Sequence, residues 1–235
     1  MTEFANPVCV ALDTPDPAKA RALLEDVRPH VGLAKVGMEL FYAHGPEGYR
    51  EVAAAGVPIF LDLKLHDIPN TVAGGMASLI KLSPLPAIVT VHASGGAEMM
   101  QAAARAIGGA ATRIVAVTVL TSLSHNDIVE VGFDAVRSTR EQAARLAGLA
   151  RASGLDGVVC SLDDLGDVRA ACGPQFLTVV PGIRPAGAPQ GDQKRIATPE
   201  SARSAGADIL VIGRPITAAP DPIAAAWGIA ASLGF

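Results

Sequence analysis

The chain has 235 residues, of which 50% are hydrophobic and 18% are charged, and its formal net charge at pH 7 is -4. This composition excludes a disordered chain, and the scattered lysines and arginines form no basic patch that would bind nucleic acid or an anionic membrane surface. The three cysteines, Cys9, Cys160 and Cys172, form no Cys-x-x-Cys pair, so neither a disulfide framework nor a zinc site is indicated and the reducing cytosol is the expected compartment.

Short β-branched runs alternate along the chain with longer segments rich in Ala, Leu, Arg and Glu, which is typical of repeated βα units around a parallel sheet. The first seven residues lack the basic and then apolar pattern of a signal peptide. Strands are expected at residues 8–12, 33–36, 59–63, 87–91, 114–118, 157–160, 177–180 and 209–212. Helices are expected at residues 17–27 (with Asp16 as N-cap), 46–55, 70–81, 97–107, 139–153, 163–171, 199–205 and 222–232.

No linker or change in composition divides these units, so the sequence predicts one α/β domain, a (β/α)8 TIM barrel spanning residues 1–235. An open doubly wound sheet is the alternative. The uncharged segment after residue 222 is too short to span a bilayer and is expected to be a buried helix.

A barrel places its active site at the carboxyl ends of its strands, and the sequence is polar there. Turn residues such as Pro58, Pro86 and Gly206 mark the amino ends instead, and this asymmetry predicts an enzyme. The polar residues at or just past the carboxyl ends are Asp13, Lys35, Asp62, Lys64, His92, Thr118, Thr121, Ser161, Arg184 and Arg214.

The third strand carries an unusual group of charges. Side chains alternate along a strand, so Asp62 and Lys64 share one face, and Lys35 on the neighbouring strand is expected beside Asp62. With Asp67 the row reads Lys35, Asp62, Lys64, Asp67, and each charge favours the ionised form of its neighbours. Such a row suits a reaction in which negative charge develops on a substrate carbon and is then protonated by an ammonium group. A solvated strand end with a chance salt bridge is the alternative.

Two further segments indicate a bound anion. Residues 181–198 form the longest stretch without regular structure, and Arg184, Gln193, Lys194 and Arg195 give it hydrogen-bond donors, so we expect a lid. Gly213 and Arg214 follow the last strand, where barrels often bind phosphate.

Several other kinds of site are absent from the sequence. The spacing of His66, Asp67 and His92 does not suit zinc, whereas a Mg²⁺ site that uses Asp62 stays open as a minor alternative. Neither a Gly-x-Ser-x-Gly elbow nor a Walker loop is present.

Six segments together are specific. They read FLDLKLHDIPNT at 60–71, VHASGG at 91–96, VTVLTS at 117–122, PGIR at 181–184, GDQKR at 191–195 and GRPIT at 213–217. On these segments the chain resembles the orotidine 5'-monophosphate decarboxylase family of the bacterial type. The resemblance implies a homodimer that converts orotidine 5'-monophosphate to uridine 5'-monophosphate (UMP) and CO2 without a cofactor, in the last step of de novo pyrimidine biosynthesis.

The resemblance also implies roles for single residues. Lys64 would protonate pyrimidine C6 after CO2 has left, with Asp62 against the departing carboxylate. Asp13 and Lys35 would bind the ribose, and Thr121 and Gln193 the pyrimidine. The phosphate would be bound by Gly213, Arg214 and Gln193, with Arg184 in the same loop system. Asp67 and Thr71 would contribute to the neighbouring subunit's site.

Two alternatives accompany this interpretation. A Mg²⁺-dependent sugar-phosphate decarboxylase or aldolase of the same barrel type also uses an Asp-x-Lys-x-x-Asp strand end, but the GDQKR and LTS segments argue against it. A nucleotide-phosphate sensor without catalysis would not need the intact charged row.

Overall fold

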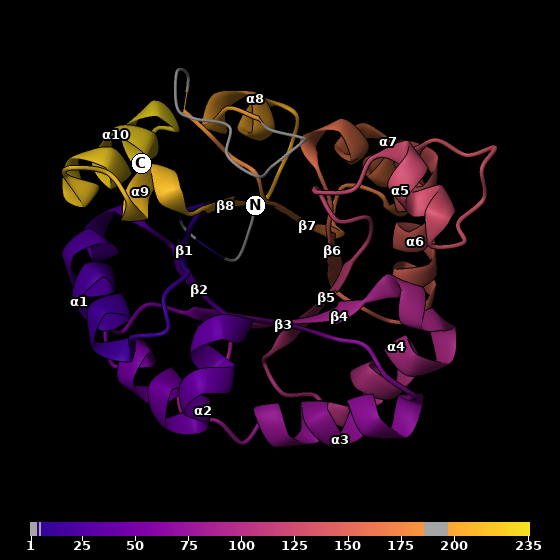
Figure 1. The fold of residues 1–235 in the computed structure, drawn as a ribbon, viewed down its shortest axis with the longest axis horizontal. Helices are drawn as coiled ribbons and strands as arrows, with labels where there is room; N and C mark the ends of the chain where they lie inside the picture. The colour runs from indigo at the N-terminus through magenta and orange to yellow at the C-terminus, as the bar shows by residue number, and fades with distance from the viewer. Residues whose placement is uncertain (1–3, 5, 186–196) are drawn as a thin grey trace.

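The computed structural model describes Phe4 and residues 6–185 and 197–235. Across these residues, eight parallel strands pair in chain order and β8 pairs back to β1, which closes the barrel seen in Figure 1. Closure confirms the predicted TIM barrel and excludes the open doubly wound sheet. The strands are β1 (Val8–Leu12), β2 (Leu33–Gly37), β3 (Ile59–Leu65), β4 (Ile88–His92), β5 (Arg113–Val117), β6 (Gly157–Val159), β7 (Leu177–Val180) and β8 (Ile209–Ile212).

The helices form the outer ring of the barrel (Figure 1). They begin at caps that the sequence provides: the Asp16 carboxylate accepts hydrogen bonds from the N–H groups of Ala18 and Lys19, as predicted. No described helix is long and apolar enough to cross a membrane. The helices are α1 (Pro17–Val27), α2 (Met38–Ala53), α3 (Pro69–Leu79), α4 (Gly96–Ala106), α5 (His125–Glu130), α6 (Thr139–Ala152), α7 (Leu162–Cys172), α8 (Pro199–Ser204), α9 (Arg214–Thr217) and α10 (Pro222–Ser232), with 3-10 turns η1 (Arg28–His30) and η2 (Ala93–Gly95).

Helix α2 differs from the prediction, which began a helix at residue 46. The structure begins it at Met38 and bends it at Gly45, whose φ of 58° and ψ of -146° lie outside the helical region. Pro46 then starts a second straight segment, because its missing N–H and fixed φ suit a first turn. The short helices α5 and α9 were not predicted either.

Alternation along the strands produces two apolar layers. On β1, Val8, Val10 and Leu12 pack outward against the helices, whereas Cys9 and Ala11 point into the barrel. The inward layer fills the barrel with side chains, so it is a packed core and not a pore. Its members are Cys9, Ala11, Leu33, Phe60, Ile88, Val115, Val179, Ile209 and Val211.

The amino ends of β7 and β8 are tied together by Arg169 on α7. Its guanidinium donates to the Asp208 carboxylate at 2.7 Å, to Thr178 Oγ1 at 2.9 Å and to the carbonyl oxygens of Phe176 and Gly206 at 2.6 and 2.7 Å. The same Asp208 oxygen accepts a hydrogen bond from the Thr178 N–H at 2.8 Å. This polar network lies on the outer side of the barrel wall and holds the amino ends of β7 and β8 against α7.

Candidate active site

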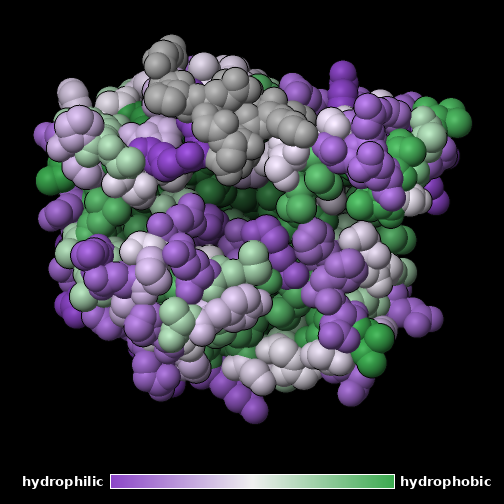
Figure 2. Space-filling model, viewed as in Figure 1, coloured by the Kyte–Doolittle hydropathy of each residue, from purple (hydrophilic) through white to green (hydrophobic). Residues whose placement is uncertain are grey.

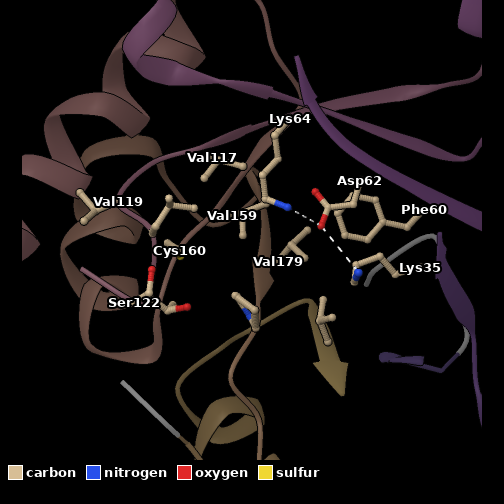
Figure 3. A pocket seen from close by; sticks show the side chains of 14 residues that line it. Lys35, Phe60, Asp62, Lys64, Val117, Val119, Ser122, Val159, Cys160 and Val179 are labelled. Atoms are coloured by element: carbon tan, nitrogen blue, oxygen red, sulfur yellow. Dashed lines mark hydrogen bonds and ion pairs between the residues drawn. The ribbon is translucent and has the colours of Figure 1, made fainter. Parts of the chain in front are cut away.

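Three charged side chains converge at the carboxyl ends of β2 and β3. The Lys64 ammonium donates to Asp62 Oδ2 at 2.8 Å, and Lys35 Nζ lies 3.9 Å from the same oxygen. Both ammonium groups point toward the Asp62 carboxylate in Figure 3. Lys35 also donates to Asp13 Oδ1 at 2.9 Å. The structure therefore brings the predicted Lys35, Asp62 and Lys64 together and adds Asp13 at the end of the row.

The register of the sheet explains this convergence. Lys35 pairs with Phe60 and Gly37 pairs with Asp62, so the side chains of Lys35 and Asp62 reach the same level at the mouth of the barrel. Phe60 lies in the inward layer, and by alternation Asp62 and Lys64 continue its face toward the open end. Packed apolar side chains therefore lie beneath the charges.

The backbone at Lys64 is unusual. Its φ is 52°, the one positive value among the described non-glycine residues, and the register between β3 and β4 shifts between Leu61 and Leu65. A left-handed conformation in a residue with a side chain costs about 1–3 kcal/mol and persists only where the surroundings impose it. Strain of this kind often marks functional residues, and here it lies at the residue that carries the central ammonium group.

The electrostatic environment keeps Lys35 charged. Burial alone would lower the pKa of Lys35, but Asp13 and Asp62 more than offset burial, so the net shift is upward. Burial raises the pKa of the Cys9 thiol directly below, which leaves it a neutral part of the core. Burial, with His66 and Lys64, lowers the pKa of His92 at the end of β4, so its ring is mostly neutral at pH 7.

A cavity of about 260 Å³ opens beside the Asp62–Lys64 pair. Charged side chains form one wall, and valines face them across the space (Figure 3). Low polarity on the far wall strengthens the field of the charged wall. The lining residues are Lys35, Phe60, Asp62, Lys64, Val117, Val119, Leu120, Thr121, Ser122, Val159, Cys160, Val179, Pro181 and Val211.

A second cavity of about 390 Å³ adjoins the first, and Lys35 lines both. Two guanidinium groups face it, and that of Arg184 is held by donation from Nη1 to the Ile183 carbonyl oxygen at 2.9 Å. Arginines on a glycine-rich wall suit a phosphate group. The lining residues are Ala11, Asp13, Lys35, Pro181, Gly182, Arg184, Val211, Gly213, Arg214 and Thr217. In the space-filling view a hollow lies near the middle of the face, with hydrophilic surface along its border (Figure 2).

Two of the predicted site residues, Asp67 and Thr71, do not line either cavity in the described part of the chain. Asp67 is exposed in the loop after β3, where its Oδ1 accepts a hydrogen bond from the Ile68 N–H at 2.6 Å. Thr71 is exposed in the first turn of α3. Within one chain the charges that lie in a row are therefore Asp13, Lys35, Asp62 and Lys64, and Asp67 of the predicted row lies apart from them.

The predicted lid is described only at its base. The chain returns on itself through a bridge between Ile183 and Ala197, and Arg184 N donates to the Ala197 carbonyl oxygen at 2.7 Å. Gln193, Lys194 and Arg195 lie outside the described residues.

One residue at this site was missed from the sequence. Thr90 on β4 is fully buried, and its Oγ1 accepts a hydrogen bond from Lys64 N at 2.7 Å and donates one to Asp62 Oδ1 at 3.0 Å. The sequence could have indicated it, because Thr90 is a polar residue two positions after the inward-facing Ile88 and therefore also points into the barrel. Within the described ranges, no group of three or more His, Cys, Asp or Glu side chains is arranged to hold a metal ion.

Comparison with known proteins finds similar proteins over nearly the whole chain. The model of the family described as "Orotidine 5'-phosphate decarboxylase / HUMPS family" matches residues 6–229. An orotidine 5'-phosphate decarboxylase from Novosphingobium aromaticivorans is 54% identical over 230 residues, which cover 98% of this chain and all of the relative. One from Paramagnetospirillum magneticum is 52% identical over 237 residues, with 98% and 99% covered. The crystal structure of orotidine 5'-phosphate decarboxylase from Lactobacillus acidophilus has a TM-score of 0.84 at 38% identity, with 98% of this chain and 100% of that chain covered.

Proposed function

The chain belongs to the orotidine 5'-phosphate decarboxylase / HUMPS family, and we infer that it catalyses the decarboxylation of orotidine 5'-monophosphate to UMP and CO2 in pyrimidine biosynthesis. The observation that carries this inference is the Asp62–Lys64 pair, which lies at one wall of an apolar cavity beside an arginine-lined one. A nucleotide has the matching parts: a flat heterocycle and a phosphate.

The two cavities set the orientation of the substrate. The phosphate binds in the cavity that Arg184, Gly213 and Arg214 line, and the pyrimidine enters the cavity walled by valines. In this orientation the ribose spans the shared region, where Lys35 and Asp13 can bind its hydroxyl groups. Thr121 lines the pyrimidine cavity, and we assign it to the edge of the ring. Gln193 has the same assignment from the resemblance of the sequence alone.

The chemical step follows from the Asp62–Lys64 pair. The bond between C6 and the carboxylate carbon breaks, CO2 leaves, and the electron pair stays on C6. The Lys64 ammonium stabilises this pair and then transfers a proton to C6, and solvent later reprotonates the amine. Asp62 lies against the departing carboxylate and fixes the Lys64 ammonium through the 2.8 Å hydrogen bond.

The charges gain catalytic value from being fixed before the substrate binds. Lys35 and Lys64 both face Asp62, so their positions need little reorganisation as negative charge moves to C6. Binding energy from the remote phosphate can then be used to hold the pyrimidine against the charged wall. The mechanism needs no electron sink from a cofactor.

We further propose that the enzyme is a homodimer in which Asp67 and Thr71 complete the partner's site. Both side chains are exposed at the carboxyl-end side of β3, and neither is engaged with the cavities of its own described chain. Ile68 between them leaves 66% of its surface exposed, which suits a loop covered by a second subunit. The resemblance of the sequence supports the same assignment.

Residues 181–198 serve in this proposal as a lid that closes over the phosphate. The support is the anchored base at Ile183 and Ala197, together with the donors that the segment carries in sequence. Closure would exclude water from the charged wall and strengthen its field.

We place the enzyme in the cytosol, because Cys9, Cys160 and Cys172 are all free and buried.

A direct assay tests the function. The purified chain is incubated with orotidine 5'-monophosphate, and UMP is quantified by chromatography and CO2 by trapping, with and without EDTA. We expect one UMP for each CO2 and equal rates in both buffers. Absence of UMP would overturn the proposed function, and loss of activity in EDTA would favour a Mg²⁺-dependent reaction of the same barrel type.

A further inference from the structure

Thr90 occupies a central position beneath the charged wall. It is fully buried on β4, and it lines neither of the two cavities. Its single hydroxyl makes two hydrogen bonds to β3: it accepts one from the Lys64 backbone N–H at 2.7 Å and donates one to Asp62 Oδ1 at 3.0 Å. One side-chain atom therefore contacts both members of the Asp62–Lys64 pair.

The first hydrogen bond lies where the sheet is irregular. The regular pairing of β3 with β4 is interrupted between Leu61 and Leu65, and Lys64 has its left-handed φ inside this interval. A buried backbone N–H needs a partner, and the Thr90 hydroxyl provides it in place of a strand carbonyl. The hydroxyl therefore helps to impose the backbone conformation that aims the Lys64 side chain.

The second hydrogen bond fixes the carboxylate. Asp62 has two oxygens with separate partners: Oδ1 accepts from Thr90, and Oδ2 accepts from the Lys64 ammonium and faces Lys35. With Oδ1 held by a buried group, the carboxylate plane cannot turn without loss of that hydrogen bond. Oδ2 is thereby kept toward the cavity, where the ammonium groups lie.

We propose that Thr90 is a positioning residue for decarboxylation, whose hydroxyl holds the Lys64 backbone in its left-handed conformation and the Asp62 carboxylate in its orientation. This inference rests on the proposed function. Thr90 acts through Asp62 and Lys64 and does not touch the substrate. Its loss therefore affects the chemical step and leaves nucleotide binding intact.

The test compares three variants with the wild type. Thr90→Val keeps the shape of the side chain and removes the hydroxyl, and Thr90→Ser keeps the hydroxyl. Thr112→Val is the matched control: Thr112 is also buried, and its hydroxyl donates to the Pro86 carbonyl oxygen at 2.8 Å, ahead of β5 at the other end of the barrel. For each protein, kcat and KM for orotidine 5'-monophosphate, the Kd for UMP and the thermal midpoint are measured.

We expect Thr90→Val to lower kcat by about 10-fold to 100-fold, the effect of a lost hydrogen bond to a charged group, with the Kd for UMP within about twofold of wild type. Thr90→Ser should restore kcat, and Thr112→Val should lower the thermal midpoint without changing kcat. A crystal structure of Thr90→Val should show that Lys64 has left φ near 52° or that the Asp62 carboxylate has turned. If Thr90→Val does not fold, Thr90→Ala provides the same comparison.

Three results would overturn the inference, and they separate its failure from that of the proposed function. An active wild type with equal kcat in Thr90→Val refutes the positioning role alone, as does a fall in kcat that Thr112→Val matches. A wild type that forms no UMP refutes the proposed function, and this inference with it.

Discussion

Replacement of Lys64 separates the two contributions that its ammonium makes. Lys64→Ala removes both the positive charge beside Asp62 and the proton donor. Lys64→Arg keeps the positive charge, but a guanidinium group does not give up its proton near pH 7. Comparison of these two variants measures the charge and the proton transfer in turn. Lys19→Ala is the control, because the Lys19 side chain is 80% exposed on α1.

The expected magnitudes follow from the contacts. Proton transfer from a positioned side chain contributes roughly 10²-fold to 10⁴-fold, and a fixed charge at the reacting atom roughly 10²-fold to 10³-fold. These effects overlap, so we expect Lys64→Ala to lower kcat by about 10⁴-fold or more, or about 5.5 kcal/mol of barrier. Lys64→Arg should lower it by about 10²-fold to 10⁴-fold, from proton transfer alone.

Folding should survive the change. In Lys64→Ala the Asp62 carboxylate keeps the hydrogen bond from Thr90 at 3.0 Å and the Lys35 ammonium at 3.9 Å, so no buried charge is left without a partner. The assay is single-turnover and steady-state decarboxylation, with UMP affinity measured by calorimetry. A Lys64→Ala variant that binds UMP and keeps more than about a tenth of wild-type kcat would refute the proton-donor role.

Three further predictions concern assembly, pH and stability. Lys64→Ala and Asp67→Ala chains that are mixed in equal amounts and allowed to exchange should regain about a quarter of wild-type activity. Half of the random dimers then contain one chain of each kind, and one of the two sites in such a dimer is intact. Burial holds the pKa of His92 below the 6.5 of the unfolded chain, so the unfolded state binds the proton first as the pH falls. The free energy of unfolding should therefore decrease below about pH 6.5, and this decrease should be smaller in His92→Gln. Arg169→Ala should lower the free energy of unfolding by about 3 kcal/mol, since it leaves Asp208 without its guanidinium, and should leave kcat unchanged.

Each of these predictions has its own control. Chains that exchange, as shown by mass spectrometry, without regained activity would contradict site sharing. His125→Gln changes an exposed histidine, and an equal effect there would exclude His92 as the source of the pH dependence. Arg140→Ala breaks an exposed ion pair with Asp167 and should cost less than about 1 kcal/mol, and equal losses for both arginines would refute the role of the buried network.

Much of the barrel could be predicted from the sequence, because strand and helix periods are local properties. The bounds of β1, β7, β8, α1 and α10 agree with the prediction to the residue. The first half of α2 was missed, because Gly45 and Pro46 suggest a break in sequence although the structure continues the helix around a bend. The short helix α5 begins at a capping box between Ser124 and Asp127, a Ser-x-x-Asp pattern that is visible in the sequence but was not used to predict a helix.

The charged wall was predictable only in part. The face shared by Asp62 and Lys64 follows from alternation, and the approach of Lys35 follows from the order of the strands. The left-handed φ of Lys64 and the role of Thr90 arise from a register shift between two strands, which no single strand encodes. The proposed place of Asp67 depends on a second chain, so one sequence folded in isolation cannot display it.

Lys35 lines both cavities, and this position has a consequence for inhibitor design. A fragment that binds between the arginines and a fragment that binds among the valines would both draw on the single positive charge of this ammonium group, which already donates to Asp13. Their affinities should therefore not add when the two are joined by a linker. A linked compound should gain most when a single acceptor, placed where the fragments meet, serves Lys35 for both.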